Sequence, residues 1–229
     1  MKSAIGDART APWWHTILVL LPLCASSLAG APQHGLPSFR VLGMTPRLSG
    51  YLLALVVEWL VVLIIWLWLR FRHLPLGILV RGSWRGPRPF FRDLGIAVGF
   101  LIVEMPLTSG LSRLLHLNFD ATAMLPHSAF ELAVWIALAM TAGFCEELIF
   151  RGYLTHQFVG WTGSPLLAIA LQGIVFGLVH AYQGKVMIII VLIGWLFGAL
   201  AWWRRSLLPG MLAHGLQDTL GGILGFISR

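Results

Sequence analysis

Ionisable side chains gather in three apolar stretches in the second half of the chain. The stretches read AGFCEELIFRGYL, FGLVHAYQG and LAHGLQDTLGG. Their candidate reactive residues are Glu146, Glu147, Arg151, His180, His214 and Asp218. Hydrolytic enzymes use carboxylates and imidazoles to activate water, either directly or through a metal ion. The three stretches therefore predict a hydrolytic site assembled from separate elements.

Helical spacing separates the roles of the two neighbouring glutamates. Residues four apart share a helix face, so Glu147 is expected to form an ion pair with Arg151. Glu146 points about 100° away. It has no basic residue three or four positions from it, which leaves it free for chemistry. His214 and Asp218 are also four apart, so the carboxylate can orient the imidazole or both can approach one centre.

Two kinds of hydrolytic site fit these side chains. Two imidazoles and a carboxylate are the composition of a zinc site that keeps a fourth position for water, with ligands among Glu146, His180, His214 and Asp218. Equally, Glu146 and His180 can activate water between them without a metal. The chain lacks an H-E-x-x-H motif, which favours the metal-free site. The spacing of His214 and Asp218 keeps the zinc site open.

The composition predicts that these stretches lie in a membrane. Of the 229 residues, 58% are hydrophobic and 11% are charged, whereas soluble domains are about 45–50% apolar and about 25% charged. A net charge of +7 on so apolar a chain indicates membrane-flanking loops, so no nucleic-acid partner is expected. Cys24 and Cys145 lack C-x-x-C spacing and are expected to be small buried residues.

Seven apolar runs predict an all-α, multi-pass bundle of about seven transmembrane helices. They cover residues 13–28, 51–69, 94–115, 130–150, 165–182, 186–203 and 208–227. The first run also has features of a signal peptide, although Pro32 after its small-residue end disfavours cleavage. If that segment is cleaved or peripheral, six spanning helices remain. No linker or repeat divides the chain, so residues 1–229 are predicted to form a single integral membrane domain.

Basic residues predict which helix ends face the cytoplasm. The connection between the second and third runs carries Arg70, Arg72, Arg81, Arg85, Arg88 and Arg92, and the positive-inside rule places it in the cytoplasm. Alternation then adds Lys2, Arg9, Arg151, Arg204 and Arg205 inside and leaves Arg40, Arg47, Arg113, Lys185 and Arg229 outside. Simple alternation also offsets Glu146 from His180 by more than a turn or two. Either the fifth helix is displaced inward, with its Gln183–Gly184 end buried in protein, or some helix boundaries are misplaced, and we favour misplaced boundaries.

The order of the motifs resembles a known protease family. E-E-x-x-x-R at 146–151, F-x-x-x-H at 176–180 and H-x-x-x-D at 214–218 resemble the CAAX protease and bacteriocin-processing (CPBP, or Abi) intramembrane proteases. The Ras-converting CAAX prenyl endopeptidases belong to this family. Each motif is weak alone, but this order on three apolar helices is specific. The resemblance covers residues 130–227 and implies peptide-bond hydrolysis inside the bilayer.

The resemblance also implies roles for individual residues. Glu146 resembles the water-activating base, and His180 resembles its partner. Glu147 and Arg151 resemble the pair that orders the site or contacts the substrate.

His214 and the residue at position 218 resemble the group that faces the scissile carbonyl. Family members commonly have Asn as well as Asp at this last position. An ionised Asp218 cannot donate a hydrogen bond to an oxyanion, so we expect it to orient His214 or bind a metal.

The expected function is that of an intramembrane endopeptidase, with lipids and a membrane-associated protein or peptide as partners, in the plasma membrane of a prokaryote. No G-x-S-G or G-x-G-D motif supports another intramembrane protease chemistry. One alternative is a non-catalytic scaffold or bacteriocin-immunity protein that binds a peptide in the same cavity. Another is a proton-coupled transporter using Glu58, Glu104 and Glu146, although structural roles are expected for Glu58 and Glu104.

Overall fold

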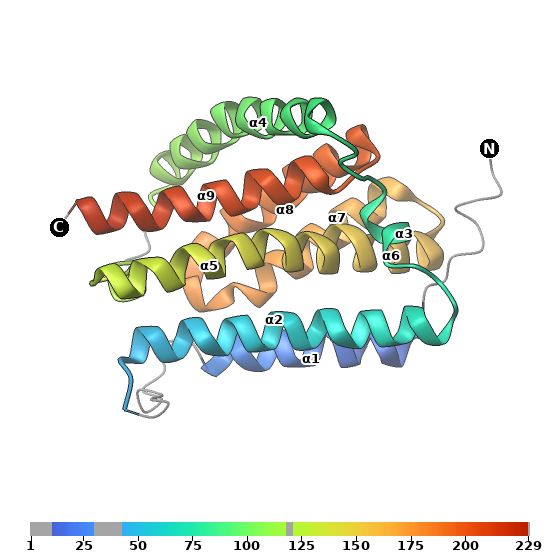
Figure 1. The fold of residues 1–229 in the computed structure, drawn as a ribbon, viewed down its shortest axis with the longest axis horizontal. Helices are drawn as coiled ribbons and strands as arrows, with labels where there is room; N and C mark the ends of the chain where they lie inside the picture. The colour runs from blue at the N-terminus through green and yellow to red at the C-terminus, as the bar shows by residue number, and fades with distance from the viewer. Residues whose placement is uncertain (1–10, 30–42, 118–120, 229) are drawn as a thin grey trace.

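Helices account for all the regular structure in the described part of the chain. The computed structural model describes residues 11–29, 43–117 and 121–228 (Figure 1). The α-helices are α1 (Trp13–Ala29), α2 (Pro46–Phe71), α3 (Gly77–Val80), α4 (Pro87–Leu114), α5 (Ala129–Glu146), α6 (Thr155–Thr162), α7 (Pro165–Val179), α8 (Met187–Arg204) and α9 (Leu208–Ile227). A π-helix, η2 (Glu147–Leu154), continues α5, and a 3-10 helix, η3 (Ala181–Val186), precedes α8.

The predicted multi-pass helical bundle is confirmed. Six of the seven predicted apolar runs follow a helix or a continuous helical segment, whereas the run 165–182 passes the end of α7 at Val179, so its predicted boundary is wrong. Four segments of the described chain are long and apolar enough to cross a bilayer: Pro46–Phe71, Pro87–Leu114, Ala129–Thr162 and Ala181–Arg204. Helices α1 and α7 are apolar but shorter, and large apolar side chains such as Trp59, Ile102 and Leu166 are exposed on the outside of the bundle. The chain is an integral membrane protein.

The helices stack in layers around α5 and α9 (Figure 1). Helix α4 covers α9 and α8, α2 lies on the other side of α5, and α1 packs on α2. The backbones of α5 and α9 approach closely because a glycine lies on each: a Cβ on Gly143 would be 2.6 Å from the Gly215 nitrogen. This crossing places Glu146 and Glu147, at the end of α5, beside His214 of α9.

The fourth apolar run extends further than the sequence predicts. It continues through η2 and α6 to Thr162, so the predicted boundary at residue 150 is wrong. Arg151, counted above among the cytoplasmic residues, is instead only 1% exposed inside η2. At a rise of about 1.5 Å per residue, Glu146 lies about 24 Å before Thr162, and His180 lies about 22 Å after Pro165. The two side chains are therefore level, and the predicted offset between them is wrong.

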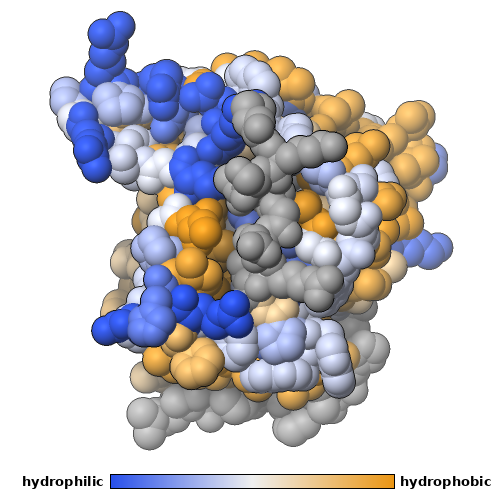
Figure 2. Space-filling view, turned by 90° about the vertical axis from the view of Figure 1, so that its right-hand side faces the viewer, coloured by the Kyte–Doolittle hydropathy of each residue, from blue (hydrophilic) through white to orange (hydrophobic). Residues whose placement is uncertain are grey.

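One end of the bundle, here called the arginine end, is formed by the connections 72–86 and 205–207. The Leu207 amide donates to the Val80 carbonyl at 2.9 Å, which joins these connections. The Asp93 carboxylate lies 2.9 Å from Arg92 and 3.6 Å from Arg204. Burial lowers the pKa of Arg81 at this end. Figure 2 views this end and shows hydrophilic side chains gathered on it.

The opposite end is formed by the connection 115–128 and the start of α2. Glu131, in the first turn of α5, accepts hydrogen bonds from Thr45 at 2.7 Å and from Arg47 at 3.2 Å. Arg72, Arg81, Arg85 and Arg205, all predicted in the cytoplasm, lie in the two connections of the arginine end. Arg47, predicted outside, lies at the opposite end. Lys2, Arg9, Arg40 and Arg229, together with the predicted cleavage region and Pro32, lie outside the described residues.

A buried polar cluster, here called the anchor network, ties α1 to η2 and α6. It consists of His15, Thr16, Tyr153 and Gln157, each at most 4% exposed. Tyr153 Oη is 2.7 Å from His15 Nδ1, and Gln157 Nε2 donates to the Ala11 carbonyl at 2.8 Å and to Thr16 at 3.0 Å.

The two cysteines differ in burial. Cys145 is buried as expected, but Cys24 is exposed on α1, so its predicted burial is wrong. Cys24 lies on the outward face of α1, whereas Val19 and Leu23 of the same helix are buried.

Candidate active site

Five of the six residues singled out by the sequence line one cavity. The cavity measures about 310 Å³, and the five residues are Glu146, Arg151, His180, His214 and Asp218. They come from α5, η2, the end of α7 and α9. Glu147, the sixth, is fully buried directly behind the cavity, in contact with Arg151 and His214. The structure therefore brings all six together, although their catalytic roles stay predictions.

Glu147 makes the ion pair expected from its spacing. Its Oε1 atom lies 3.1 Å from Arg151 Nη1 and 3.3 Å from His214 Nδ1. The Arg151 contact is a charge pair outside hydrogen-bonding geometry. A Cβ on Gly210 would lie 2.9 Å from Glu147 Oε2, so the glycine leaves room for this carboxylate.

Two aromatic rings hold the buried Arg151 guanidinium. Its central carbon lies 4.2 Å from the centroid of the Phe176 ring and 5.3 Å from that of Phe197. Cation–π attraction compensates part of the desolvation of an arginine that is 1% exposed. The Phe176 ring also packs on His180, with centroids 4.8 Å apart, which gives the F-x-x-x-H motif a physical reason.

His180 stands at the C-terminal end of α7, with one ring nitrogen engaged by the backbone. Its Nδ1 lies 2.8 Å from the Phe176 carbonyl oxygen. A carbonyl only accepts, so Nδ1 carries the hydrogen and Nε2 is the nitrogen left for a cavity ligand. Glu146 lines the same cavity, with its side chain 16% exposed. Glu146 and His180 therefore line the same cavity.

Carboxylates approach both ring nitrogens of His214. Nδ1 faces Glu147 Oε1, whereas Nε2 lies 3.7 Å from Glu146 Oε2 and 3.5 Å from Asp218 Oδ2. Carboxylate oxygens accept hydrogen bonds, so each nitrogen has an acceptor opposite it. Carboxylates therefore lie beside both nitrogens of the ring, and the one from Glu147 is within hydrogen-bonding distance of Nδ1.

The described residues do not fit the zinc alternative as they stand. Within residues 11–29, 43–117 and 121–228, no three His, Cys, Asp or Glu side chains are arranged to hold a metal ion. Of the proposed zinc ligands, Glu146 and Asp218 lie 3.7 and 3.5 Å from His214 Nε2, so their oxygens contact the imidazole nitrogen itself.

Further residues at the cavity were not found from the sequence. Phe197, Trp135, Tyr182 and Gln217 line it. Gln217 lies three residues after His214, and that helical spacing could have indicated it. The three aromatic residues gave no such signal, because aromatic side chains are spread through all the apolar runs.

Glu58 and Glu104, for which the sequence predicts structural roles, differ in their contacts. Glu104 accepts from Gln217 at 3.1 Å and from Thr108 at 3.2 Å, so it supports a wall of the cavity from α4. Glu58 on α2 is 6% exposed, and its Oε2 makes no hydrogen bond among the described residues. Neither lines the cavity.

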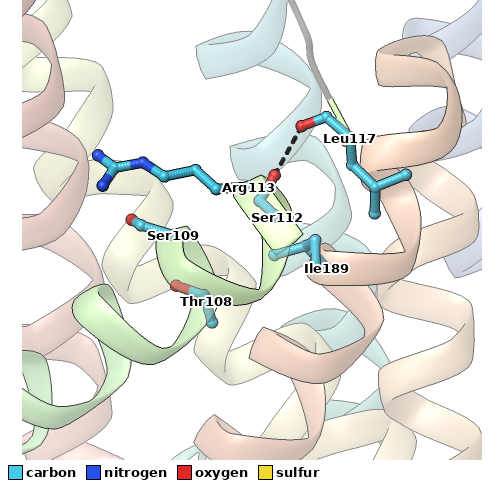
Figure 3. A pocket seen from close by; sticks show the side chains of 6 residues that line it. All are labelled: Thr108, Ser109, Ser112, Arg113, Leu117 and Ile189. Atoms are coloured by element: carbon cyan, nitrogen blue, oxygen red, sulfur yellow. Dashed lines mark hydrogen bonds between the residues drawn. The ribbon is translucent and has the colours of Figure 1, made fainter. Parts of the chain in front are cut away.

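A second cavity lies between the C-terminal end of α4 and the start of α8 (Figure 3). It measures about 350 Å³ and is lined by Thr108, Ser109, Ser112, Arg113, Leu117 and Ile189. Ser112 donates to the Leu117 carbonyl at 2.7 Å. The lining includes no carboxylate or imidazole to activate water. The cavity around Glu146 is therefore the better candidate for hydrolysis.

Comparison with protein families identifies the segment that carries this site. Residues 128–220 match the family model of the Rce1-like type II CAAX prenyl endopeptidases. This segment is Rce1-like. The resemblance seen in the three motifs is confirmed for this segment. Comparison with curated proteins and with solved structures finds no match.

The match starts at the N-cap of α5 and ends within α9. It therefore contains all six candidate residues, while α1 to α4 lie before it. An Rce1-like segment supports a hydrolase that acts on peptide bonds.

Proposed function

We propose that this protein is an intramembrane endopeptidase that cleaves a membrane-associated protein or peptide, in the plasma membrane of a prokaryote. The observation that carries the proposal is the cavity shared by Glu146 and His180, with His180 Nδ1 engaged by the Phe176 carbonyl. Water between a carboxylate and a fixed imidazole nitrogen is arranged for general-base activation.

The proposed reaction begins with proton transfer. The Glu146 carboxylate takes a proton from the water held at His180 Nε2, and the water oxygen attacks the scissile carbonyl carbon. The carbonyl electron pair moves to its oxygen and forms a tetrahedral oxyanion. When this intermediate collapses, the C–N bond breaks and the leaving nitrogen takes the proton from Glu146. One water is consumed, and a carboxylic acid and an amine form.

His214 is the donor that we assign to the oxyanion. Its Nε2 lies at the cavity, where Glu146 and Asp218 orient it. Preorganised donors aimed at developing charge typically contribute about 10²–10³ in rate. Asp218 accepts hydrogen bonds when ionised, so we assign it the orientation of His214 rather than direct contact with the oxyanion.

The alternative of a non-catalytic peptide-binding scaffold or immunity protein uses the same cavity. The two functions separate when membranes carrying the wild-type chain and Glu146→Gln are compared by mapping peptide termini. New termini that depend on Glu146 support the protease, and identical termini support the scaffold. Asp93→Asn is the matched control, because Asp93 is a buried carboxylate at the arginine end, remote from the cavity.

The metal-free chemistry makes a separate prediction for chelation. Treatment of the purified enzyme with a chelator should leave cleavage unchanged, because Glu146 and His180 suffice to activate water. The measurement is the cleavage rate before and after chelation and after zinc is added back. Loss of activity that zinc restores would contradict the proposed water activation.

A further inference from the structure

The second cavity, between the C-terminal end of α4 and the start of α8, carries a positive charge without a matching negative one. Its polar lining residues are Thr108, Ser109, Ser112 and Arg113. No carboxylate lines it, and Arg113 forms no ion pair within the described part of the chain. A guanidinium has five donors and no acceptor, so the chemistry of this cavity suits an anion.

Only one of the three hydroxyls at this cavity has its hydrogen available for a ligand. Ser112 donates to the Leu117 carbonyl at 2.7 Å, and Thr108 donates to the Glu104 carbonyl at 2.9 Å. Each hydroxyl has a single hydrogen, so neither can also donate to an anion. Ser109 is exposed and makes no hydrogen bond within the described residues, which leaves its hydrogen for a ligand.

Arg113 and Ser109 can act on the same ligand. They are four residues apart on α4 and therefore share a helix face. Figure 3 shows both side chains projecting from the same side of the helix. The planar guanidinium fork matches the oxygens of a phosphate or carboxylate with two parallel hydrogen bonds, and the serine hydroxyl adds a third donor.

The cavity lies where a polar headgroup would meet the apolar surface of the bundle. Helix α4 is long and apolar enough to cross a bilayer, and Arg113 is in its last turn. On the same face of α4, Ile102 lies about 10 Å from Ser109 toward the middle of the helix and is 68% exposed. Ile188 beside the cavity on α8 is also exposed. This order of groups matches a ligand whose phosphate is joined to hydrocarbon chains.

From these observations we propose that the cavity between α4 and α8 binds the phosphate of an anionic membrane phospholipid, with Arg113 and Ser109 as its donors. The acyl chains then lie along the outer face of α4, over Ile102. The lining has no carboxylate to pair with the ammonium group of a zwitterionic headgroup, so a headgroup of net negative charge is favoured. The site is separate from the cavity around Glu146, and the inference does not depend on the proposed protease function.

Site-resolved cross-linking to the full-length protein tests the proposal. A phosphatidylglycerol with a photoreactive diazirine in its acyl chain is bound to the purified protein in detergent and irradiated, and the cross-linked peptides are mapped by mass spectrometry. The yield on residues 101–117 measures occupancy of this site. Unlabelled phosphatidylglycerol, phosphatidylcholine and inorganic phosphate are then compared as competitors.

We expect phosphatidylglycerol to compete best, phosphatidylcholine to compete more weakly, and inorganic phosphate not to compete. Both lipids carry a phosphate, but the choline cation has no carboxylate to pair with in this cavity. Equal competition by the two lipids would overturn the preference for an anionic headgroup. Displacement by inorganic phosphate at the same concentration would make free phosphate the ligand and overturn the lipid assignment.

Variants of the arginine test whether the phosphate contact holds the lipid. Arg113→Gln removes the guanidinium fork, so the affinity for phosphatidylglycerol at this site should fall by about 10–100-fold. Arg70→Gln is the matched control, because Arg70 is also exposed in the last turn of a spanning helix but does not line the cavity. Its affinity should equal that of the wild type. An unchanged affinity in Arg113→Gln, or an equal loss in Arg70→Gln, would overturn the site.

Two milder variants keep the proposal testable if Arg113→Gln does not fold. Ser109→Ala removes one neutral donor, so the affinity should fall by a smaller factor of about five. Arg113→Lys keeps the charge but loses the planar fork, so it should also bind more weakly. Wild-type affinity in both variants would overturn the assignment of Arg113 and Ser109 as the phosphate donors.

Discussion

Two polar clusters lie within the apolar bundle, and they differ in how completely their groups are paired. In the anchor network, His15, Tyr153 and Gln157 are buried and hydrogen-bonded to one another, to Thr16 or to Ala11. The candidate site, here called the open cluster, consists of Glu146, Glu147, Arg151, His180, His214 and Asp218. There, the Oε2 atoms of Glu146 and Glu147 make no hydrogen bond within the described chain, and a cavity lies beside them.

The difference indicates which cluster holds helices and which is arranged for chemistry. Polar groups in an apolar interior cost free energy unless they are paired, so a completed network stabilises packing. A carboxylate left open toward a cavity, as Glu146 is, keeps that cost and gains the capacity to bind water and substrate. Both clusters contain a histidine in an apolar helix, so residue type alone would not have separated them.

The largest expected effect is the loss of cleavage when the open cluster loses its general base. Glu146→Gln keeps the size of the side chain but removes the base, so cleavage should fall by about 10²–10⁴-fold. The amount of folded protein should be unchanged, because Glu146 is part-exposed and lacks an ion-pair partner of fixed positive charge. The measurement is the cleavage rate per folded molecule in purified protein.

A second change removes the buried ion pair of the same cluster. Arg151→Met leaves Glu147 buried without its cation, so the free energy of unfolding should fall by about 3–5 kcal/mol. Glu147→Gln should behave similarly because it leaves Arg151 unpaired. The double variant removes both charges and should recover part of the loss, as unfolding in detergent would measure. Equal stability of the wild type and both single variants would show that the ion pair does not hold η2.

A third change breaks the anchor network instead. Tyr153→Phe removes the hydroxyl that contacts His15 and Thr16, so stability should fall by about 1–3 kcal/mol. Cleavage per folded molecule should stay at the wild-type level, since this hydroxyl lies away from the cavity. A fall in cleavage without a fall in stability would remove the distinction between the two clusters.

The smallest expected effect measures how much Asp218 contributes to cleavage. Asp218→Asn keeps a polar group beside His214 but removes a charge that is 40% exposed. Exposed charge pairs contribute about 0–1 kcal/mol, which corresponds to less than a tenfold change in cleavage. The rate of the purified variant measures this directly. A loss as large as that of Glu146→Gln would instead give Asp218 a direct part in catalysis.

The sequence predicted the helices well because their apolar runs are long, but it misplaced the ends that matter for the site. The charged Arg151 suggested a helix end, whereas Glu147 and two aromatic rings stabilise it inside η2. A π-helix has no clear sequence signature, so the continuation to Thr162 could not be foreseen. Because the predicted spans cross the membrane in simple alternation, they put Glu146 and His180 at different depths.

The candidate residues themselves were predictable from charge in apolar runs, since such charges are rare without a role. The residues that contact them were harder to predict from the sequence. Phe197 contacts Arg151 from α8, and Gln217 links Glu104 to the cavity wall. These contacts depend on how helices far apart in sequence pack together, which periodicity in a single segment does not encode.

The central claim is that the open cluster performs chemistry and the anchor network only holds helices. The most direct test measures cleavage of one verified substrate by Glu146→Gln and Tyr153→Phe side by side, each normalised to folded protein. The account predicts that Glu146→Gln is folded and inactive, whereas Tyr153→Phe unfolds more easily and cleaves at the wild-type rate. Wild-type cleavage by Glu146→Gln would contradict it.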